Sequence, residues 1–378
     1  MVPDSLPLRS PDTSALGSSA LGSTAIDIIA ACSPVARELA RAAPAAISPI
    51  ADSPISPEPL DRRRFLHRAA AALAIAGSGT LATAGCSPRS STEADAIIGR
   101  IGIGAGRFQK PRALAIDSTD RLFVVDMTGR IQSFDPDGRP LALWRTPDIH
   151  QGKPTGLTIS PEGHLWVADT HYFRILEYTA DGTLLPERTL GGTNGTAPGE
   201  FGLVTDVAVD STGCRYVSEY GEFDRIQKFA PDGSFVIEWG GHGKEPGKFL
   251  RPQSLAIDEQ DRVWVADACN HRVQLFDLSS GKVELVHSWG MEGTAPGELR
   301  YPYGLILVDD TVVLAEYGNH RVQQLTRDGE PIAIWGRAGR GSGELDQPWS
   351  VARDSRGRYF VLDSYNHRIQ RFRFGREG

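Results

Sequence analysis

Residues 252–276 read PQSLAIDEQDRVWVADACNHRVQLF, and residues 111–134 read PRALAIDSTDRLFVVDMTGRIQSF. Both segments contain two apolar, β-rich runs, then an arginine, then a third run. Six such segments occur, and each places an acid after its second run, at Asp126, Asp169, Glu219, Asp267, Glu316 and Asp363. These acids are 43 to 50 residues apart. Self-similarity at a nearly constant period indicates a repeat architecture.

Each repeat has the composition of a small antiparallel sheet. Apolar and β-branched runs alternate with turn sequences such as PDG at residues 231–233. Glycine-rich links join successive repeats at residues 240–249, 290–299 and 336–345. One four-stranded sheet cannot cover its own faces, whereas a ring of such sheets can. We therefore predict an all-β fold, a six-bladed β-propeller with four antiparallel strands per blade.

The ends of the repeat array predict how the ring closes. The sixth repeat stops after its third strand, at residues 371–374, whereas residues 97–102 resemble the outer strand and link of other repeats. We expect this N-terminal strand to complete the last blade, because that pairing removes an exposed edge. The propeller should therefore span residues 97–378, with residues 87–96 as a linker.

The segment before the repeats has the composition of an address. Residues 1–60 are rich in Ala, Ser and Pro, and we expect them to be disordered. Residues 61–86 resemble a twin-arginine export signal, with RRRFLH at residues 62–67 and an alanine-rich run at 69–81. That run is too short to form a stable membrane span. We expect export to the periplasm or the outer cell envelope.

Two cleavage sites are compatible with this signal. TAGC at residues 83–86 resembles a lipobox, although Thr83 stands where leucine is usual, and cleavage there would place a lipid on Cys86. ATA at residues 82–84 also fits an ordinary signal peptidase. The only membrane attachment that the sequence predicts is this lipid anchor on Cys86.

The triplet Asn-His-Arg at residues 270–272, 319–321 and 366–368, followed by Val or Ile and then Gln, resembles the NHL repeat. The resemblance covers residues 97–378 and implies the same six-bladed propeller. That family includes RNA readers, protein-interaction modules and a lyase, so the fold alone does not determine function. The net charge of −7 and the pI of 5.8 argue against a nucleic-acid partner.

A more distant resemblance is to the propeller of the peptidyl-hydroxyglycine amidating lyase. It implies zinc-binding histidines just after the residue that opens an inner strand. Those positions hold Arg112, Thr155, Thr205, Gln253, Tyr303 and Trp349, and none is histidine, so a zinc mechanism lacks its ligands. Tyr220 falls near the place of the lyase's catalytic tyrosine. We attribute this to shared repeat ancestry, and we assign no catalytic residue.

Two repeated features each allow a binding and a structural interpretation. Every acid is followed by an arginine, at Arg130, Arg174, Arg225, Arg272, Arg321 and Arg368. These arginines could form a ring for an anionic ligand, but six-fold repetition favours one hairpin clasp per blade. His271, His320 and His367 could bind a metal, and their repetition favours blade packing instead.

One face of the propeller should collect both the blade-to-blade links and the hairpins between second and third strands. Its expected aromatic residues are Tyr172, Phe173, Tyr220, Phe223, Tyr303, Tyr317, Trp349 and Tyr365. An aromatic-rimmed channel mouth suits a protein, a peptide or a glycan. The ligand-binding residues that we expect there are Arg112, Asp206, Tyr220, Gln253, Tyr303 and Trp349.

Asp206 sets the third repeat apart. The equivalent position holds a small residue in the other repeats: Ala113, Gly156, Ser254, Gly304 and Ser350. Asp206 either caps an amide or pairs with Arg112, or it binds ligand or a cation together with nearby Glu222 and Asp224. Calcium is the expected ion, because only oxygen ligands are available. We expect no other cofactor.

These observations favour a binding function over catalysis. We expect an exported, monomeric scaffold that presents the channel mouth to a protein, peptide or glycan. The alternative is a propeller enzyme, of the amidating-lyase or lactonase kind, that acts at the same mouth.

Overall fold

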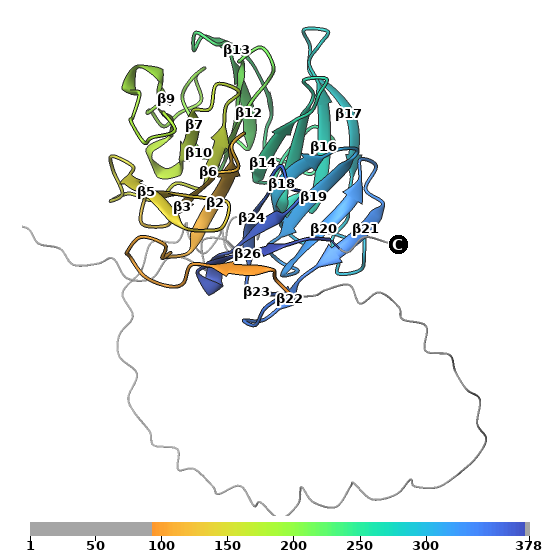
Figure 1. Ribbon diagram of the computed structural model, residues 1–378. Coiled ribbons are helices and arrows are strands. Elements are labelled where there is room, and N and C mark those ends of the chain that lie inside the picture. The colour runs from red at the N-terminus through yellow and green to blue at the C-terminus, as the bar shows by residue number, and fades with distance from the viewer. Residues whose placement is uncertain (1–92, 375–378) are drawn as a thin grey trace, which may run out of the picture. The chain divides into compact units, whose positions relative to one another are not determined.

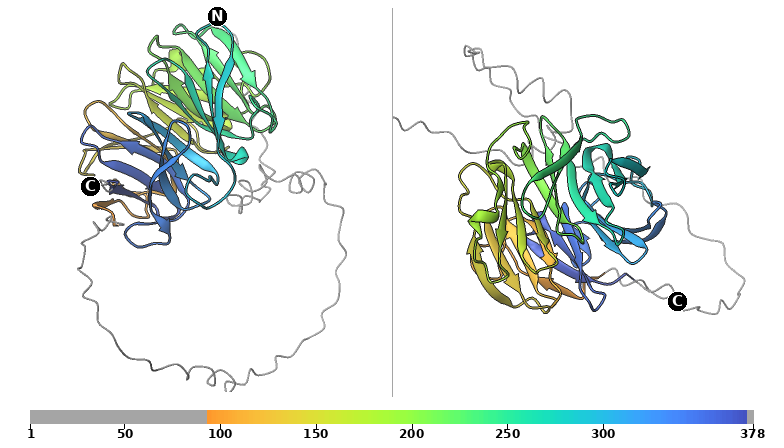
Figure 2. Two further views of the ribbon diagram at one scale, coloured as in Figure 1. Left: turned by 90° about the vertical axis from the view of Figure 1, so that its right-hand side faces the viewer. Right: turned by 90° about the horizontal axis from the view of Figure 1, so that it is seen from above.

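The computed structural model describes residues 93–374, so the expected disordered lead-in (1–60), the export signal and Cys86 lie outside the described residues. Six four-stranded antiparallel sheets form the blades of a propeller (Figure 1; Figure 2). The described residues contain no helix long and apolar enough to cross a bilayer. The predicted all-β, six-bladed fold is confirmed.

Each blade runs outward from the central channel in four strands. The inner strands are β2 (Pro111–Ile116), β6 (Gly156–Ile159), β10 (Leu203–Val209), β14 (Pro252–Ile257), β18 (Pro302–Val308) and β24 (Pro348–Arg353). The second strands are β3 (Leu122–Asp126), β7 (Leu165–Asp169), β11 (Arg215–Tyr220), β15 (Val263–Asp267), β19 (Thr311–Glu316) and β25 (Tyr359–Asp363). The third strands are β4 (Arg130–Phe134), β8 (Arg174–Tyr178), β12 (Arg225–Phe229), β16 (Arg272–Asp277), β20 (Arg321–Thr326) and β26 (Arg368–Phe372).

The outer strands are the most exposed part of each blade. They are β5 (Pro140–Arg145), β9 (Leu190–Gly191), β13 (Phe235–Gly240), β17 (Glu284–Trp289), β21 (Pro331–Trp335) and β1 (Ala96–Ile98). A further short parallel pair, β22 (Arg337–Ala338) and β23 (Glu344–Leu345), forms part of the last link. The second strands are buried along most of their length, because they are covered on both faces by neighbouring blades.

Strand β1 closes the ring as the sequence predicts. It pairs antiparallel with β26, placing Ala96 opposite Arg371 and Ile98 opposite Ile369. The strand begins one residue earlier than expected, at Ala96 rather than Ile97. Figure 1 shows this orange segment beside the blue strands of the last blade. The last blade is therefore built from both ends of the described chain.

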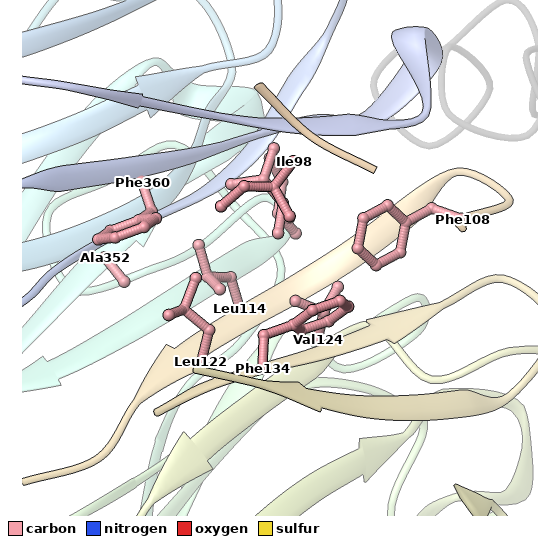
Figure 3. Packing of buried hydrophobic residues seen from close by; sticks show 10 residues of the cluster. Ile98, Phe108, Leu114, Leu122, Val124, Phe134, Ala352 and Phe360 are labelled. Carbon is pink, nitrogen blue, oxygen red and sulfur yellow. The ribbon is translucent and has the colours of Figure 1, made fainter. Parts of the chain in front are cut away.

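The hydrophobic core is divided into six clusters, each between two adjacent blades. In the cluster at the closure, Ile98 and Phe360 of the last blade pack near Leu114 and Leu122 of the first (Figure 3). The apolar residue that ends each glycine-rich link is fully buried between blades, as at Phe249 and Leu299. Burial of these side chains joins neighbouring blades into one ring.

Candidate functional site

A β-bulge near the start of the inner strand occurs in five of the six blades. The register of each inner strand shifts there, so one extra residue stands between two paired ones. A bulge redirects the side chain of its extra residue. The residues at the five shifts include Arg112, Thr205, Gln253, Tyr303 and Trp349. We call the end of the channel around these residues, together with Tyr220 and Arg251, the mouth.

A cavity of about 410 Å³ lies inside the ring and is lined by residues of the inner strands. Of the expected ligand-binding residues, Arg112, Asp206, Gln253, Tyr303 and Trp349 line this cavity. Tyr220 is not part of the lining, but its ring lies 4.4 Å from the guanidinium carbon of Arg251 beside the mouth. The structure thus places all six residues at or next to one cavity.

The aromatic rings at the mouth pack mainly against one another, whereas the sequence predicts an exposed aromatic rim. Tyr303 stacks on Tyr317 with ring centroids 4.6 Å apart, and it meets the ring of Trp349 edge-on at 4.9 Å. These three residues are buried, so much of their ring surface contacts other rings. Tyr220 and Tyr365 remain partly exposed at the mouth. Packing therefore accounts for part of the aromatic set that the sequence places on this face.

Two guanidinium groups lie against these rings. Arg112 is positioned over the ring of Trp349, at 4.7 Å from the centroid. Arg251 lies between Tyr220 and Tyr303, at 4.4 and 5.2 Å from their centroids. Cation–π contacts of this kind hold arginine in a desolvated place without a carboxylate partner.

Two lysines add to the positive charge of the mouth. Burial and the nearby charges of Arg112 and Lys110 lower the pKa of Lys153. The ammonium of Lys110 lies 4.2 Å from the ring centroid of Tyr365. Within residues 93–374, no carboxylate forms an ion pair with Arg112, Arg251, Lys110 or Lys153, although many other cations of the propeller are paired.

Several hydrogen-bond donors in the mouth lack acceptors among the described residues. They are Nε of Arg112, the hydroxyl of Tyr303 and Nε1 of Trp349, all buried. Gln253 is oriented by Arg251, whose Nε donates to Gln253 Oε1 at 2.8 Å. With its oxygen used in this way, the side chain of Gln253 presents its amide nitrogen as a further donor.

Asp206 accepts hydrogen bonds from the neighbouring blade. One carboxylate oxygen accepts from the Ser254 hydroxyl at 3.1 Å and from the Leu255 amide at 3.0 Å, and the other accepts from the Val207 amide at 2.9 Å. Burial raises the pKa of Asp206 to about 7. These contacts match the expectation of an amide cap, and the alternative pairing with Arg112 is not formed.

Asp224, expected as a rim acid beside Asp206, is buried and has a structural place. Its Oδ1 accepts from the backbone amide of Arg251 at 2.9 Å, and its Oδ2 lies 2.5 Å from Nδ1 of His242. Glu222 is exposed. Asp224 thus fixes the backbone from which Arg251 extends toward the mouth.

The acid–arginine pairs are clasps. Nε of Arg272 donates to Asp267 at 2.8 Å, and its terminal nitrogens donate to the carbonyls of Lys244, Glu245 and Lys248 in the preceding link. The same acid–arginine contact occurs as Asp126–Arg130, Asp169–Arg174, Glu219–Arg225, Glu316–Arg321 and Asp363–Arg368. Each arginine therefore uses its donors within the fold, which excludes the ring of arginines open to an anion.

The three repeated histidines connect adjacent blades. Nδ1 of His271, His320 and His367 accepts from the backbone amide of Tyr301, Gln347 and Lys110, respectively. Each histidine adopts a left-handed backbone conformation at the end of its hairpin. The blade-packing interpretation is confirmed, since the ring nitrogens are turned to three separate blade junctions.

Metal ligands do not converge at the mouth. No group of three or more His, Cys, Asp or Glu side chains able to hold a metal occurs in residues 93–374. Four of the positions that the lyase resemblance assigns to zinc ligands hold Arg112, Gln253, Tyr303 and Trp349, which line the cavity. The cation of Arg112 repels zinc, and the other three side chains are not zinc ligands. The site does not fit zinc, and the calcium expected at Asp206 is a separate question that titration tests.

Arg251, Lys110 and Lys153 were not among the sequence candidates. Arg251 and Lys110 directly precede the proline that opens an inner strand, and both have positive φ, 60° and 44°. Their place before a repeated proline is a signal that sequence could supply, but the direction of the side chain depends on the left-handed turn. Lys153 lies in the irregular first link, which has no counterpart in the other repeats.

Comparisons with known proteins agree with this architecture. The family model for the NHL repeat matches residues 249–276 and 345–372. Human NHL repeat-containing protein 3 is 31% identical over 213 residues, or 52% of this chain and 60% of that protein. Rat peptidylglycine alpha-amidating monooxygenase is 38% identical over 134 residues, or 32% of this chain and 13% of that protein. The chain thus spans at most 60% of the length of these two relatives.

A solved structure of a streptogramin B lyase has the same fold. It superposes with a TM-score of 0.51 at 15% sequence identity, covering 74% of this chain and 87% of that one. At this identity the likeness concerns the fold alone. Repeat match, relatives and blade geometry agree: residues 249–276 and 345–372 match the NHL repeat, and the described residues form a six-bladed β-propeller.

Proposed function

We propose that this protein is a binding scaffold that takes a protein, a peptide or a glycan at the mouth of its channel. The observation that carries the proposal is the concentration of unpaired donors and cations around a cavity of about 410 Å³. Buried polar groups are normally satisfied within a protein, so a group of unsatisfied donors gathered around one cavity supports a ligand that completes them.

The proposal includes the cellular setting. The twin-arginine resemblance of residues 61–86 supports export, and the TAGC sequence supports a lipid anchor on Cys86. In that setting the propeller acts as a monomer in the cell envelope, and the mouth is available to partners outside the cytoplasm. Labelling of growing cells with radioactive palmitate, compared between wild type and Cys86→Ala, tests the anchor.

The binding test uses arrays of peptides and glycans probed with the full chain. Ser350 lines the cavity, and its hydroxyl donates one long hydrogen bond, of 3.5 Å, to the carbonyl oxygen of Leu114. Ser350→Trp should therefore fill the channel without removing a clasp. Lys282→Ala, at an exposed outer hairpin, is the matched control. We expect ligands that bind wild type and the control but not Ser350→Trp. Ligands that bind all three proteins equally would place the site elsewhere and contradict the proposal.

A propeller enzyme acting at the same mouth is the second candidate. The feature that favours it is Tyr220, whose ring lies against Arg251 next to the cavity. The matched relatives include a probable peptidyl-alpha-hydroxyglycine alpha-amidating lyase of Caenorhabditis elegans, 35% identical over 137 residues. Incubation with a peptidyl-α-hydroxyglycine tests this candidate. Release of amide by wild type and its loss in Tyr220→Phe would replace the scaffold by an enzyme.

A further inference from the structure

The mouth offers donors and positive charge but few acceptors. Arg112, Gln253, Tyr303 and Trp349 all line the cavity, and each has a donor without an acceptor among residues 93–374 or directs one into the cavity. The acid that lines the same cavity, Asp206, already accepts hydrogen bonds from Val207, Ser254 and Leu255. A group that satisfies this set must bring several oxygen acceptors of its own.

Arg112 has the geometry of an anion-binding arginine. Its guanidinium lies over the indole of Trp349, 4.7 Å from the ring centroid. A cation–π contact uses none of the hydrogen-bond donors of the guanidinium, so its N–H groups stay available for an acceptor. Arg112 makes no hydrogen bond or ion pair within the described residues, and its Nε is buried. The contact with Trp349 holds the guanidinium of Arg112 in place, and the donors of the guanidinium have no acceptor within residues 93–374.

Positive charges gather around Arg112, and the only acid among the described residues that line the cavity is Asp206. Burial lowers the pKa of Arg112, and the positive charge of Arg251 contributes in the same direction. Lys110 and Lys153 are close enough to influence each other, and neither forms an ion pair within residues 93–374. Gathering like charges in a partly desolvated place is unfavourable unless an anion binds there.

We propose that the mouth binds its ligand through a carboxylate group, which Arg112 holds by a planar pair of hydrogen bonds. The amide of Gln253 and the hydroxyl of Tyr303 are the neighbouring donors, and Lys153 and Lys110 supply the surrounding positive field. This assignment rests on the proposed binding function and names the chemistry that the ligand must carry.

The arrangement favours a carboxylate over a phosphate. At the mouth end of the cavity, Arg112 is the single guanidinium in the lining and matches the two coplanar oxygens of a carboxylate, whereas Arg353 lines the opposite end. The other donors in the lining at the mouth are neutral side chains. A phosphate dianion is tetrahedral and is usually held by several cations or by a series of backbone amides. The lysines surround this site and do not line the cavity.

The test compares matched acids and amides on the full chain by ligand-observed NMR titration. One pair is N-acetylglycine and N-acetylglycinamide, which represents a peptide carboxyl end, and the other is glucuronate and glucuronamide, which represents an acidic sugar. We expect the acid of one pair to bind about tenfold more tightly than its amide, since hydrogen bonds to a charged group contribute this much. The pair that shows the preference identifies the source of the carboxylate.

Substitutions test whether Arg112 causes the preference for acid over amide. Arg112→Met should bind acid and amide alike, whereas Arg353→Met, the same change at the opposite end of the channel, should keep the wild-type preference. Arg112→Lys, which keeps the charge without the planar fork, should retain part of it. Thermal unfolding of each variant shows whether the fold is intact, and Arg112→Lys decides the question if Arg112→Met does not fold.

Three results would overturn the assignment: equal binding of acid and amide to wild type, an unchanged preference in the Arg112 variants, or tighter binding of inorganic phosphate than of either acid. The carboxylate assignment can fail while the proposed binding function holds. Array ligands that Ser350→Trp blocks, but that show no acid preference, would leave the scaffold intact and remove only the carboxylate.

Discussion

Arg272 shows, at the scale of a single residue, how the repeat signature works. Its guanidinium contacts the fully buried Asp267 and three carbonyls of the link between the third and fourth blades. One side chain therefore joins a hairpin to the connection that precedes its blade. The same use of arginine in every blade explains why the motif recurs without forming a binding surface.

Replacement of this arginine should destabilise the propeller strongly. Arg272→Ala leaves the carboxylate of Asp267 buried without its charge partner, and we expect a loss of roughly 3–5 kcal/mol of unfolding free energy. Urea unfolding measures the loss, with Lys282→Ala as the exposed control. Unchanged stability together with lost ligand binding would restore the interpretation of these arginines as an anion ring.

Asp206 makes stability depend on pH. Its pKa is about 7 in the folded chain, above the ordinary value of 3.8, so folding favours the protonated form. The contribution of Asp206 is fully present below about pH 4 and is lost as the pH rises toward 7, by up to roughly 4 kcal/mol. Asp206→Asn lacks this titration. Urea unfolding between about pH 4 and 8 should show wild type losing stability relative to the variant, and parallel curves would refute the shift.

The sequence predicts the kind of residue at the mouth better than its contacts. Arg112, Gln253, Tyr303 and Trp349 could be placed there because each follows the first residue of an inner strand. The bulges that turn them toward the channel have no sequence mark of their own, since they arise from the pairing of two strands. Arg251 was missed for a similar reason, because its direction depends on a left-handed turn held by Asp224.

At the scale of elements, β1 is the piece on which ring closure depends. Three of its residues pair with β26, and Ile98 is buried among residues of the first and last blades. The hairpin of the first blade also packs closely there, because a Cβ at Gly138 would lie 2.6 Å from Ile98. Without β1, strand β26 becomes an open edge.

Two truncations separate this role from that of the preceding segment. Deletion of residues 1–90 should leave the melting temperature of the propeller unchanged, whereas deletion through Gly106 should lower it. Burial of Ile98 alone accounts for about 2 kcal/mol. Full-length Ile98→Ala and the exposed Ile97→Ala provide a matched pair, in which the first should destabilise and the second should not. Equal melting temperatures for the two truncations would contradict the role of β1 in closing the ring.

The second blade is the element that the repeat pattern describes least well. Its outer strand β9 has two residues, and a 3₁₀ turn at Pro186–Arg188 precedes it. Leu176 occupies the position at which other blades have a glutamine that donates a hydrogen bond to a carbonyl of the preceding link, as Gln274 does to Lys248. The link between the first and second blades lacks this hydrogen bond and therefore differs in course from the other links. Periodicity predicts the members of an array and not the departures, which depend on local contacts.

At the scale of the whole molecule, the ring could be predicted because each level of the sequence supports it. The repeat period sets the number of blades, apolar runs set the strands, and the incomplete last repeat sets the closure. The chemistry of the channel could not be predicted in the same way. It depends on which side chains from different blades meet at one point, such as Arg112 of the first blade and Trp349 of the last.

The charge of the mouth and the lack of clustered ligands among the described residues predict the metal content of the propeller. Because the mouth is positively charged and no cluster of three metal-ligating side chains occurs in residues 93–374, we expect no stoichiometric zinc in the purified full chain by plasma mass spectrometry. Asp206 is the carboxylate to examine for calcium, but its oxygens accept three hydrogen bonds and its raised pKa disfavours the anion that calcium requires.

Calorimetric titration of calcium into wild type and Asp206→Ala decides this point, and we expect equal heats for the two proteins. Calcium binding to wild type that is lost in Asp206→Ala would establish a cation site and invert the electrostatics of the mouth, since a bound cation would be the largest local charge. Stoichiometric zinc would favour the enzyme over the scaffold. A carboxylate ligand could then reach the metal directly, and the preference for acid over amide should survive in Arg112→Met, which is the outcome that separates the two accounts.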